Sequence, residues 1–476
     1  MADTSWEDLW RPPAVRRLAR ELADIAADEL TRRSGPVRPP DFVARTRRAL
    51  RRGARPGHLA AAVKALAEAG LHLNHPRYMA QQVAAPIPAA ALAESAVAAL
   101  NQSIAVLRMS PAGTLVDREV IARFKPLFGL PASAEGSLVP GGSFANLTAL
   151  VAARAALDPQ AWSQGGARIA IVAGAQTHYS ISRAAGIMGL GADAVFSIPQ
   201  DGAFRTDPAR ASAAFAAARR AGYRKFILAA TCGSTSTGSC DDLRALAAVA
   251  RRERAWFHVD AAHGGGFAFS RRLRGKLRGI ERADSLTFDP HKTLFMPLAA
   301  GAVLVRRGRY LRGAFTQHAP YLFRGGARPI APNVGEFTIA CSQRFDALKI
   351  WLTWQAYGGA FFGGLIERAC DATLAAHDYC LRSPLLEPAH RPECNIFCFR
   401  LRRPPRRAAA ADRRHAELED AVNESGQAYI SSTVLDGRRV LRIVVLNPRT
   451  TAADTVAVMR LVERLAGREG ARGLSY

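Results

Sequence analysis

The sequence predicts an α/β protein with a mainly parallel central sheet, an N-terminal helical segment and a smaller C-terminal α+β domain. Between residues 101 and 358, short apolar or β-branched runs alternate with Ala-rich helical runs, which is typical of parallel strands joined by helical crossovers. Helical periodicity dominates residues 1–100, and strand-like runs reappear in the last part of the chain. We therefore expect three parts, comprising residues 1–100, 101–358 and 359–476.

The N-terminal part is expected to consist of several amphipathic helices. Its Ala, Leu and Arg residues recur with helical spacing from Trp6 to about Leu100. Turn-forming residues interrupt this pattern at Gly35-Pro36, at Pro39-Pro40 and at Asn74-His75-Pro76. These breaks separate the predicted helices.

The central part contains candidate strands with helical runs, such as Asp242–Arg252, between them. The central strands are predicted at Arg168–Ala175, Lys225–Thr231, Trp256–Ala261, Ser285–Phe288 and Gly301–Arg306. Two further strands, Asn395–Arg400 and Arg439–Leu446, are predicted after the Gly358-Gly359 pair. The Arg- and Pro-rich stretch between them is predicted to be an exposed connection.

Composition narrows the classes of partner and the cellular compartment. The formal net charge is +25, but it comes almost wholly from arginines scattered along helical runs, and only six lysines occur. Scattered arginines are typical of a solvated surface, so we expect no nucleic-acid partner. We expect neither a signal peptide nor a membrane span. The seven cysteines include no C-x-x-C pair, which favours a reducing cytoplasm over a disulfide framework or a zinc knuckle.

A lysine directly after a predicted buried strand is the first candidate catalytic group. The run Ser285–Phe288 is followed by Asp289-Pro290-His291-Lys292, which places one of the six lysines in a turn at the end of a strand. Schiff-base chemistry requires a partly buried amine, and strand ends in α/β sheets face the ligand crevice. An ordinary turn is the alternative for this motif taken alone.

A carboxylate inside another predicted strand is the second candidate. Asp260 follows a mostly apolar run, so it needs a partner, and a protonated pyridine nitrogen is suitable. Small residues follow it, Ala262 among them, and would let a flat ring lie close. The same stretch supports a rival hypothesis. His258 and Asp260 share a strand face, and with His263 they could form a metal site of two histidines and one carboxylate.

Two further segments have the chemistry of cofactor contacts. Pro140-Gly141-Gly142-Ser143 runs into an Ala- and Leu-rich helix, with Ser143 as the expected N-cap. Free N–H groups and the helix dipole at such a turn bind phosphate, although a plain helix cap is the alternative. His178 follows the predicted strand Arg168–Ala175, where an imidazole can stack on a cofactor ring or bond the loop backbone.

Together these pieces supply an amine, a buried acid, a stacking group and a phosphate cradle, which are the parts that pyridoxal phosphate requires. In this combination the chain resembles the group II pyridoxal-phosphate-dependent amino acid decarboxylases, the family of glutamate, aspartate, aromatic amino acid and diaminobutyrate decarboxylases. The resemblance extends from about His75 to Thr451. Its motifs, in chain order, are His75-Pro76-Arg77-Tyr78, Ser110–Thr114, Gly141–Asn146, His258–Ala262, Asp289-Pro290-His291-Lys292, Arg344–Trp351 and Leu441–Pro448.

The resemblance implies a role for each candidate. Lys292 would form the Schiff base with the cofactor, Asp260 would pair with the ring nitrogen and His178 would stack on the ring. The other implied cofactor contacts are Gly142, Ser143, Thr231, Ala262 and His291. The implied substrate contacts are Gln81 and Arg442, and the implied proton donor is Tyr321 in a mobile loop. Departures from the family pattern at Pro140 and in residues 231–236 leave the details of the pocket open.

The resemblance also implies the fold, the reaction and the assembly. The fold is that of PLP-dependent transferases of the aspartate aminotransferase type I. The reaction is α-decarboxylation of an L-amino acid to a primary amine and carbon dioxide, without a metal. The assembly is a homodimer with the active site at the subunit interface. Aldehyde-forming oxidative deamination, transamination and carbon–carbon lysis on the same fold remain alternatives, as does a cofactor-free binding protein.

The substrate is the least determined part of this interpretation. The segment His75–Gln81 looks more like the glutamate, aspartate and diaminobutyrate branch than the aromatic one. Arg324 and Arg328, near the expected mobile loop, either meet an acidic side chain of the substrate or face water.

Overall fold

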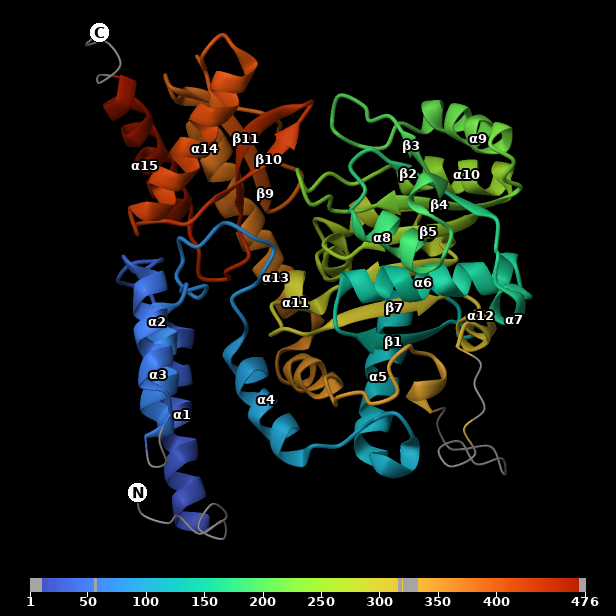
Figure 1. Cartoon of the computed structure of the whole chain (residues 1–476), viewed down its shortest axis with the longest axis horizontal. Helices are drawn as coiled ribbons and strands as arrows, with labels where there is room; N and C mark the ends of the chain where they lie inside the picture. The colour runs from blue at the N-terminus through green and yellow to red at the C-terminus, as the bar shows by residue number, and fades with distance from the viewer. Residues whose placement is uncertain (1–10, 55–57, 316–318, 320–332, 471–476) are drawn as a thin grey trace. The chain divides into compact units, whose positions relative to one another are not determined.

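The computed structural model describes residues 11–54, 58–315, 319 and 333–470 (Figure 1). The chain forms two compact units. The large unit comprises residues 89–370 and 392–396, and the small unit comprises the remainder of the chain. The three-part division expected from the sequence describes successive stretches of chain rather than compact units, and it stays a prediction.

A seven-stranded sheet is the centre of the large unit, with the strand order β1-β7-β6-β5-β4-β2-β3. β7 runs antiparallel to its neighbours β1 and β6, and the other neighbouring strands are parallel. The strands are β1 (Glu135–Val139), β2 (Ile169–Gly174), β3 (Val195–Ile198), β4 (Lys225–Thr231), β5 (Trp256–Ala261), β6 (Ser285–Phe288) and β7 (Gly301–Val305). The predicted fold class, an α/β protein with a mainly parallel sheet, is confirmed.

Most predicted strands agree with the structure, but the sequence prediction missed β1 and β3 of this sheet, and also β8 (Leu386–Pro388) and β10 (Ser431–Leu435) nearer the C-terminus. β4, β5 and β6 have the predicted bounds. β1 contains Gly136, and glycine is disfavoured in strands. A Cβ atom there would lie 2.4 Å from Leu304 Cδ2, so the close packing of β1 on β7 requires glycine. β3 is an edge strand and is only partly buried, which weakens its apolar pattern.

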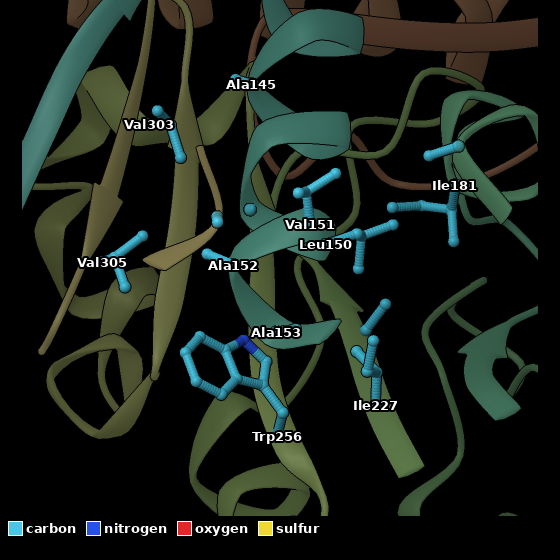
Figure 2. Close-up of a cluster of buried hydrophobic side chains, with 14 of the residues drawn as sticks. Ala145, Leu150, Val151, Ala152, Ala153, Ile181, Ile227, Trp256, Val303 and Val305 are labelled. Atoms are coloured by element: carbon cyan, nitrogen blue, oxygen red, sulfur yellow. The ribbon is translucent and has the colours of Figure 1, made fainter. Parts of the chain in front are cut away.

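Helix α6 (Gly142–Leu157) packs on the sheet and on helix α8 (Ser180–Ile187). It contacts β5, β6 and β7. Figure 2 shows Leu150 and its neighbours on α6 in one apolar cluster with Trp256 of β5 and Val303 of β7. Because the middle of this helix, from Ala145 to Ala153, is largely buried, its first turn is held beside the sheet.

Further helices complete the large unit. α9 packs on β2 and β3, and α10 packs on β4 and β5. They are α4 (Pro88–Leu100), α5 (Pro111–Leu127), α7 (Ala161–Gln164), α9 (Ala211–Arg220), α10 (Leu243–Glu253), α11 (Pro290–Thr293) and α12 (Gly308–Gly313). The chain then passes into the small unit through α13 (Ala347–Arg382), where Gly358 interrupts the helical geometry with a φ of 74°.

The small unit combines the N-terminal helices with a four-stranded sheet of order β10-β11-β9-β8. Its elements are α1 (Pro12–Thr31), α2 (Phe42–Arg52), α3 (Leu59–Ala69), β8 (Leu386–Pro388), β9 (Ile396–Leu401), α14 (Ala408–Glu424), β10 (Ser431–Leu435), β11 (Arg438–Val444) and α15 (Ala452–Gly470). The predicted helix breaks lie between α1 and α2 and after α3, which confirms them. Within the described residues, none of the helices is long and apolar enough to cross a membrane.

Candidate active site

The predicted cofactor residues follow the carboxyl ends of strands in the large unit. β1 is antiparallel to β7, which is antiparallel to β6, so β1 runs in the same direction as β2, β4, β5 and β6. Asp260 is in register with Thr231 on β4 and with Thr287 on β6. Because the carboxyl ends of parallel strands meet at one edge of a sheet, the segments that follow them lie together there.

Lys292 is held beside a buried carboxylate. It lies in the short helix α11, and its Nζ is 3.0 Å from Asp289 Oδ2. Its side chain is 19% exposed, so a carbonyl compound can reach the amine. His291 Nε2 lies 3.5 Å from the same oxygen. Burial lowers the pKa of His291, and its Nδ1 accepts the backbone N–H of Ala300 at 3.1 Å, so the neutral ring carries its proton on Nε2.

Asp260 is buried and accepts hydrogen bonds at both carboxylate oxygens. Asn146 Nδ2 donates to Oδ2 at 2.8 Å, and the backbone N–H of Ala262 donates to Oδ1 at 3.0 Å. An ionised carboxylate only accepts hydrogen bonds, which suits this arrangement. Burial of a carboxylate is costly without a positive partner, so the position fits a protonated ring nitrogen.

His178 lies in the turn between β2 and α8. Its Nδ1 is 2.8 Å from Ser180 Oγ and accepts the backbone N–H of Ser180 at 3.3 Å. Burial lowers the pKa of the imidazole, the charge of Asp260 raises it, and the charge of Lys292 lowers it again. Asn146 Nδ2 donates both to Asp260 Oδ2 and to Ser180 Oγ, so His178 and Asp260 belong to one hydrogen-bonded group.

The first turn of α6 is a candidate phosphate cradle. The helix begins at Gly142 and no side chain caps it. The expectation that Ser143 is the N-cap is wrong, because the backbone N–H of Ala145 already bonds the carbonyl of Gly141 and Ser143 lies inside the first turn. A Cβ atom on Gly142 would lie 2.8 Å from Asp289 Oδ2, so only glycine fits there. The uncapped N–H groups of this 16-residue helix suit an anion.

Two buried polar atoms among these groups have no hydrogen-bond partner in the described part of the chain. They are Thr231 Oγ1 and Asp289 Oδ1. Buried polar atoms are nearly always hydrogen-bonded, so these two indicate a ligand. The partly exposed amine, the buried acid, the uncapped helix and these two atoms together fit pyridoxal phosphate.

The rival metal site is not assembled. His258 is fully buried, and its two ring nitrogens lie within hydrogen-bond distance of Ser285 and Asn146. His263 Nε2 lies 2.8 Å from Asn395 Oδ1. Residues 11–54, 58–315 and 333–470 contain no group of three His, Cys, Asp or Glu side chains that could hold a metal ion. The metal hypothesis for His258, Asp260 and His263 therefore has no geometric support.

Comparison with known families agrees with this geometry. Residues 60–402, well over half of the chain, match the family described as "Pyridoxal-dependent decarboxylase conserved domain". The chain belongs to the pyridoxal-dependent decarboxylase family.

Relatives of this family member are similar to it over most of their length. The L-2,4-diaminobutyrate decarboxylase of Rhizobium meliloti (strain 1021) is 35% identical over 388 residues, which are 81% of this chain and 76% of the relative. The aromatic-L-amino-acid decarboxylase of Bacillus atrophaeus is 30% identical over 400 residues, which are 83% of this chain and 82% of the relative.

Solved structures show the same fold. The crystal structure of mouse CSAD has a TM-score of 0.90 at 27% identity and covers 96% of this chain and 99% of its own. The structure of Oryza sativa TDC with PLP and tryptamine has a TM-score of 0.86 at 25% identity and covers 97% and 99%, respectively. The predicted fold type, the cofactor and the class of PLP-dependent amino acid carboxy-lyase are confirmed. The roles of individual residues stay predictions.

The two predicted substrate residues of this decarboxylase lie together in the small unit. Arg442 on β11 is 5% exposed, and its Nε donates to Ser431 Oγ at 3.1 Å. Its Nη2 lies 3.5 Å from Gln81 Oε1. Burial lowers the pKa of the Arg442 guanidinium. Tyr321, Arg324 and Arg328 lie outside the described residues.

Sequence reasoning assigned no role to Asn146 or Asp289, although both contact predicted catalytic groups. Each lies within a motif that carries the family resemblance. Asn146 is a polar residue in a largely apolar stretch of α6, and Asp289 is a carboxylate directly after the buried strand β6. Buried polar residues in such positions are the signal that could have identified them.

Proposed function

We propose that this chain uses pyridoxal phosphate to remove the α-carboxylate from an L-amino acid, with release of a primary amine and carbon dioxide. The observation that carries the proposal is the grouping of Lys292, Asp260 and His178 at one edge of the sheet beside the uncapped start of α6. When bound, the cofactor supplies an electron sink for cleavage of a bond at the α carbon.

Different residues of the large unit bind different parts of the cofactor. Lys292 provides the amine that attaches the cofactor, and Asp260 provides the negative charge for the ring nitrogen. His178 stacks on the ring and limits its tilt. The phosphate is held by Gly142, Ser143 and His291. Thr231 and Ala262 would line the space for the ring, where the cofactor would offer a hydrogen-bond partner to the Thr231 hydroxyl, which has none among the described residues.

In the small unit we assign Arg442 and Gln81 to substrate binding. A guanidinium binds a carboxylate with two parallel hydrogen bonds, provided that its plane is fixed. The bond from Arg442 Nε to Ser431 Oγ restricts that plane, and Gln81 lies beside it. This arrangement supports Arg442 as the partner of the substrate's α-carboxylate.

The proton donor that we assign by resemblance is Tyr321, which lies outside the described residues. A phenol can return a proton to the α carbon once carbon dioxide has left. Tyr321→Phe should therefore still release carbon dioxide but yield less amine. The difference should appear as carbonyl product, matched either by consumed dioxygen or by cofactor that keeps the amino group. An unchanged amine yield would move this role to another group.

One incubation tests the reaction. Purified protein should be yellow, and borohydride reduction should fix the cofactor to Lys292, as read by peptide mass. Carbon dioxide, amine, ammonia and hydrogen peroxide are then measured together. Equal amounts of carbon dioxide and amine support the proposal. Ammonia or peroxide in place of amine would contradict it and favour oxidative deamination, and a labelled lysine other than Lys292 would refute the attachment site.

For the substrate we propose an acyclic polar amino acid. The supporting observations are the His75–Gln81 segment and the 35% identity to an L-2,4-diaminobutyrate decarboxylase. A panel of common amino acids plus diaminobutyrate, read out as kcat/KM for amine formation, tests this. Faster turnover of an aromatic amino acid than of diaminobutyrate, glutamate and aspartate would contradict it.

We further assign the chain to a homodimer in the cytoplasm. α1 and α2 bury none of their residues, and they expose large apolar side chains such as Val15, Leu22 and Leu50. Exposed apolar side chains on long helices favour a protein partner, and the resemblance implies a second copy. The seven free cysteines support a reducing compartment. Light scattering should give twice the chain mass, and a monomer mass would contradict the dimer.

A further inference from the structure

A buried amide connects the two sides of the candidate active site. Asn146, in the second turn of α6, is 1% exposed. Its Nδ2 donates to Asp260 Oδ2 at 2.8 Å and to Ser180 Oγ at 2.9 Å. Its Oδ1 lies 2.6 Å from Thr287 Oγ1, which donates to it, and 3.1 Å from His258 Nε2. One side chain therefore joins α6, β5, β6 and the start of α8.

The carboxylate end sets the direction of these hydrogen bonds. An ionised carboxylate only accepts, so the atom of Asn146 that faces Asp260 must be Nδ2. Because Nδ2 also donates to Ser180 Oγ, the hydroxyl proton of Ser180 is left for His178 Nδ1, 2.8 Å away. The backbone N–H of Ser180 donates to the same Nδ1 at 3.3 Å. A ring nitrogen that accepts from two donors cannot carry the proton, so neutral His178 carries it on Nε2.

The opposite end of the network agrees with this direction. Trp256 Nε1 can only donate, and it donates to Ser285 Oγ at 2.8 Å. Asn146 Oδ1 can only accept, so His258 carries its proton on Nε2, which donates to that oxygen, and His258 Nδ1 accepts from Ser285 Oγ at 3.0 Å. Burial lowers the pKa of His258 to about 4, so the ring is neutral near pH 7 and this order is kept. The carboxylate of Asp260 therefore sets the direction through Asn146, and the indole N–H of Trp256 is compatible with it.

We propose that Asn146 and Ser180 are positioning residues that keep the imidazole proton of His178 on Nε2 while Asn146 holds Asp260 in place. His178 then offers an N–H group, rather than a lone pair, on the edge of the ring away from Ser180. Such a group donates to an anionic oxygen and cannot act as a base. The identity of that anion, a carboxylate of the amino acid or an oxygen of the cofactor, rests on the proposed function, whereas the state of the ring does not.

A purely structural role for the network is the rival explanation. Loss of any buried hydrogen bond destabilises a fold, whatever its effect on catalysis. Ser137 offers a matched control, because it is fully buried in β1 of the same unit and its Oγ donates to the backbone oxygen of Leu138 at 2.9 Å. Ser137→Ala removes a buried hydroxyl without touching the network.

The test reads the protonation of His178 directly. Cofactor-loaded enzyme is labelled with ¹⁵N in histidine, and solid-state NMR reports which ring nitrogen carries the proton. The His178 signals are assigned through their loss in His178→Gln. In Ser180→Ala we expect a mixture of the two tautomers, and in Ser180→Thr, which returns the hydroxyl, the wild-type state. Turnover should fall about tenfold in Ser180→Ala, while cofactor affinity changes less than about threefold.

Asn146→Ala adds the loss of support for Asp260. Cofactor affinity should then fall about tenfold or more, together with the change of tautomer. Ser137→Ala should alter neither quantity. If Asn146→Ala does not fold, Ser180→Ala is a sufficient test. If the His178 proton stays on Nε2 in Ser180→Ala, the proposal is wrong. A wild-type enzyme that releases no carbon dioxide, but whose Ser180→Ala variant changes tautomer, would refute the proposed function and support this inference.

Discussion

Two buried aspartates of the large unit differ in how completely the chain satisfies them. Asp260 is 5% exposed and both of its oxygens accept hydrogen bonds. Asp289 is 1% exposed, and its Oδ2 lies near Lys292 Nζ and His291 Nε2, but no described residue bonds its Oδ1. The chain therefore supplies hydrogen bonds to both oxygens of Asp260, whereas it leaves one oxygen of Asp289 without a hydrogen bond among the described residues.

This difference separates a preorganised region from a region that changes when the cofactor binds. Around Asp260 every hydrogen bond in the network of Asn146 has a defined direction, so little has to move. Around Asp289, the amine of Lys292 that faces the carboxylate would be altered if Lys292 holds the cofactor as proposed. Mutations around Asp260 should therefore disturb hydrogen bonds that exist before the cofactor binds. Mutations around Asp289 should mainly change how the cofactor is bound.

The largest effect is expected at Lys292, which we propose as the attachment lysine. Lys292→Ala should lower turnover by about 10³-fold or more and remove the borohydride-fixed adduct. Lys276 is the matched control, because it is also half-buried and its Nζ lies 2.7 Å from the carboxylate of Glu393. Lys276→Ala should keep turnover within about threefold, since a partly exposed ion pair contributes little. Similar losses of turnover in both variants would mean that turnover depends on the positive charge of the protein and not on the amine of Lys292.

The same isosteric substitution should have unequal effects at the two aspartates. Asp260→Asn places an amide donor against Asn146 Nδ2 or the N–H of Ala262, which should cost about 1–3 kcal/mol of folding free energy. Asp289→Asn can turn its amide nitrogen to the side of Oδ1, where no described residue donates, and should cost less. Turnover with bound cofactor should fall about 10³-fold in Asp260→Asn and about tenfold in Asp289→Asn.

Urea unfolding of the apo-protein and kcat at saturating cofactor check this pair. Equal losses of stability in the two variants would contradict the different satisfaction of the two carboxylates. Near wild-type turnover in Asp260→Asn would remove Asp260 from the electronic support of the ring.

Sequence patterns predicted the parts of the fold whose signals are local. Long apolar runs identified β4 and β5, and Gly and Pro residues identified the breaks between the N-terminal helices. β1 was missed because Gly136 is favourable only where it meets Leu304 of β7, a contact that lies far away along the chain. When a residue is buried by a partner far away along the chain, the local sequence shows no periodic pattern of apolar residues.

The same division applies to the site. Lys292, Asp260 and His178 became candidates because each lies at or just after a strand end, and parallel topology brings strand ends together. The function of Asn146 depends on which atoms of β5, β6 and the start of α8 face it, and spacing alone does not contain those contacts. The expected cap at Ser143 was wrong for a related reason, because a backbone hydrogen bond from Ala145 starts the helix earlier.

The hydrogen-bond network around Asp260 should also affect how the free energy of unfolding depends on pH, through His258. Burial lowers the pKa of His258 from 6.5 to about 4. Between these values the unfolded chain binds a proton that the folded chain does not, so stability falls as the pH drops through this window. At about pH 4.5 the loss should reach about 2 to 3 kcal/mol relative to pH 7. His258→Gln keeps an amide donor for Asn146 and does not titrate, so this part of the loss should be absent.

Urea unfolding of wild type and His258→Gln at the two pH values measures this difference. Other buried histidines, such as His291, are common to both proteins and cancel. An identical pH dependence in wild type and variant would show that His258 does not remain neutral in the folded protein.

The smallest expected effect compares two buried threonines. Thr206 Oγ1 donates to Asp241 Oδ2 at 2.8 Å, whereas Thr231 Oγ1 has no partner among the described residues. Thr206→Val should destabilise the apo-protein by about 1–2 kcal/mol, because it leaves a buried carboxylate short of a donor. Thr231→Val removes a hydroxyl that is buried without a partner, so the apo-protein should be as stable as wild type or slightly more stable. If the cofactor bonds that hydroxyl, its dissociation constant should rise about tenfold in Thr231→Val and stay unchanged in Thr206→Val. A loss of apo-protein stability in Thr231→Val, with unchanged cofactor affinity, would mean that the chain itself satisfies Thr231.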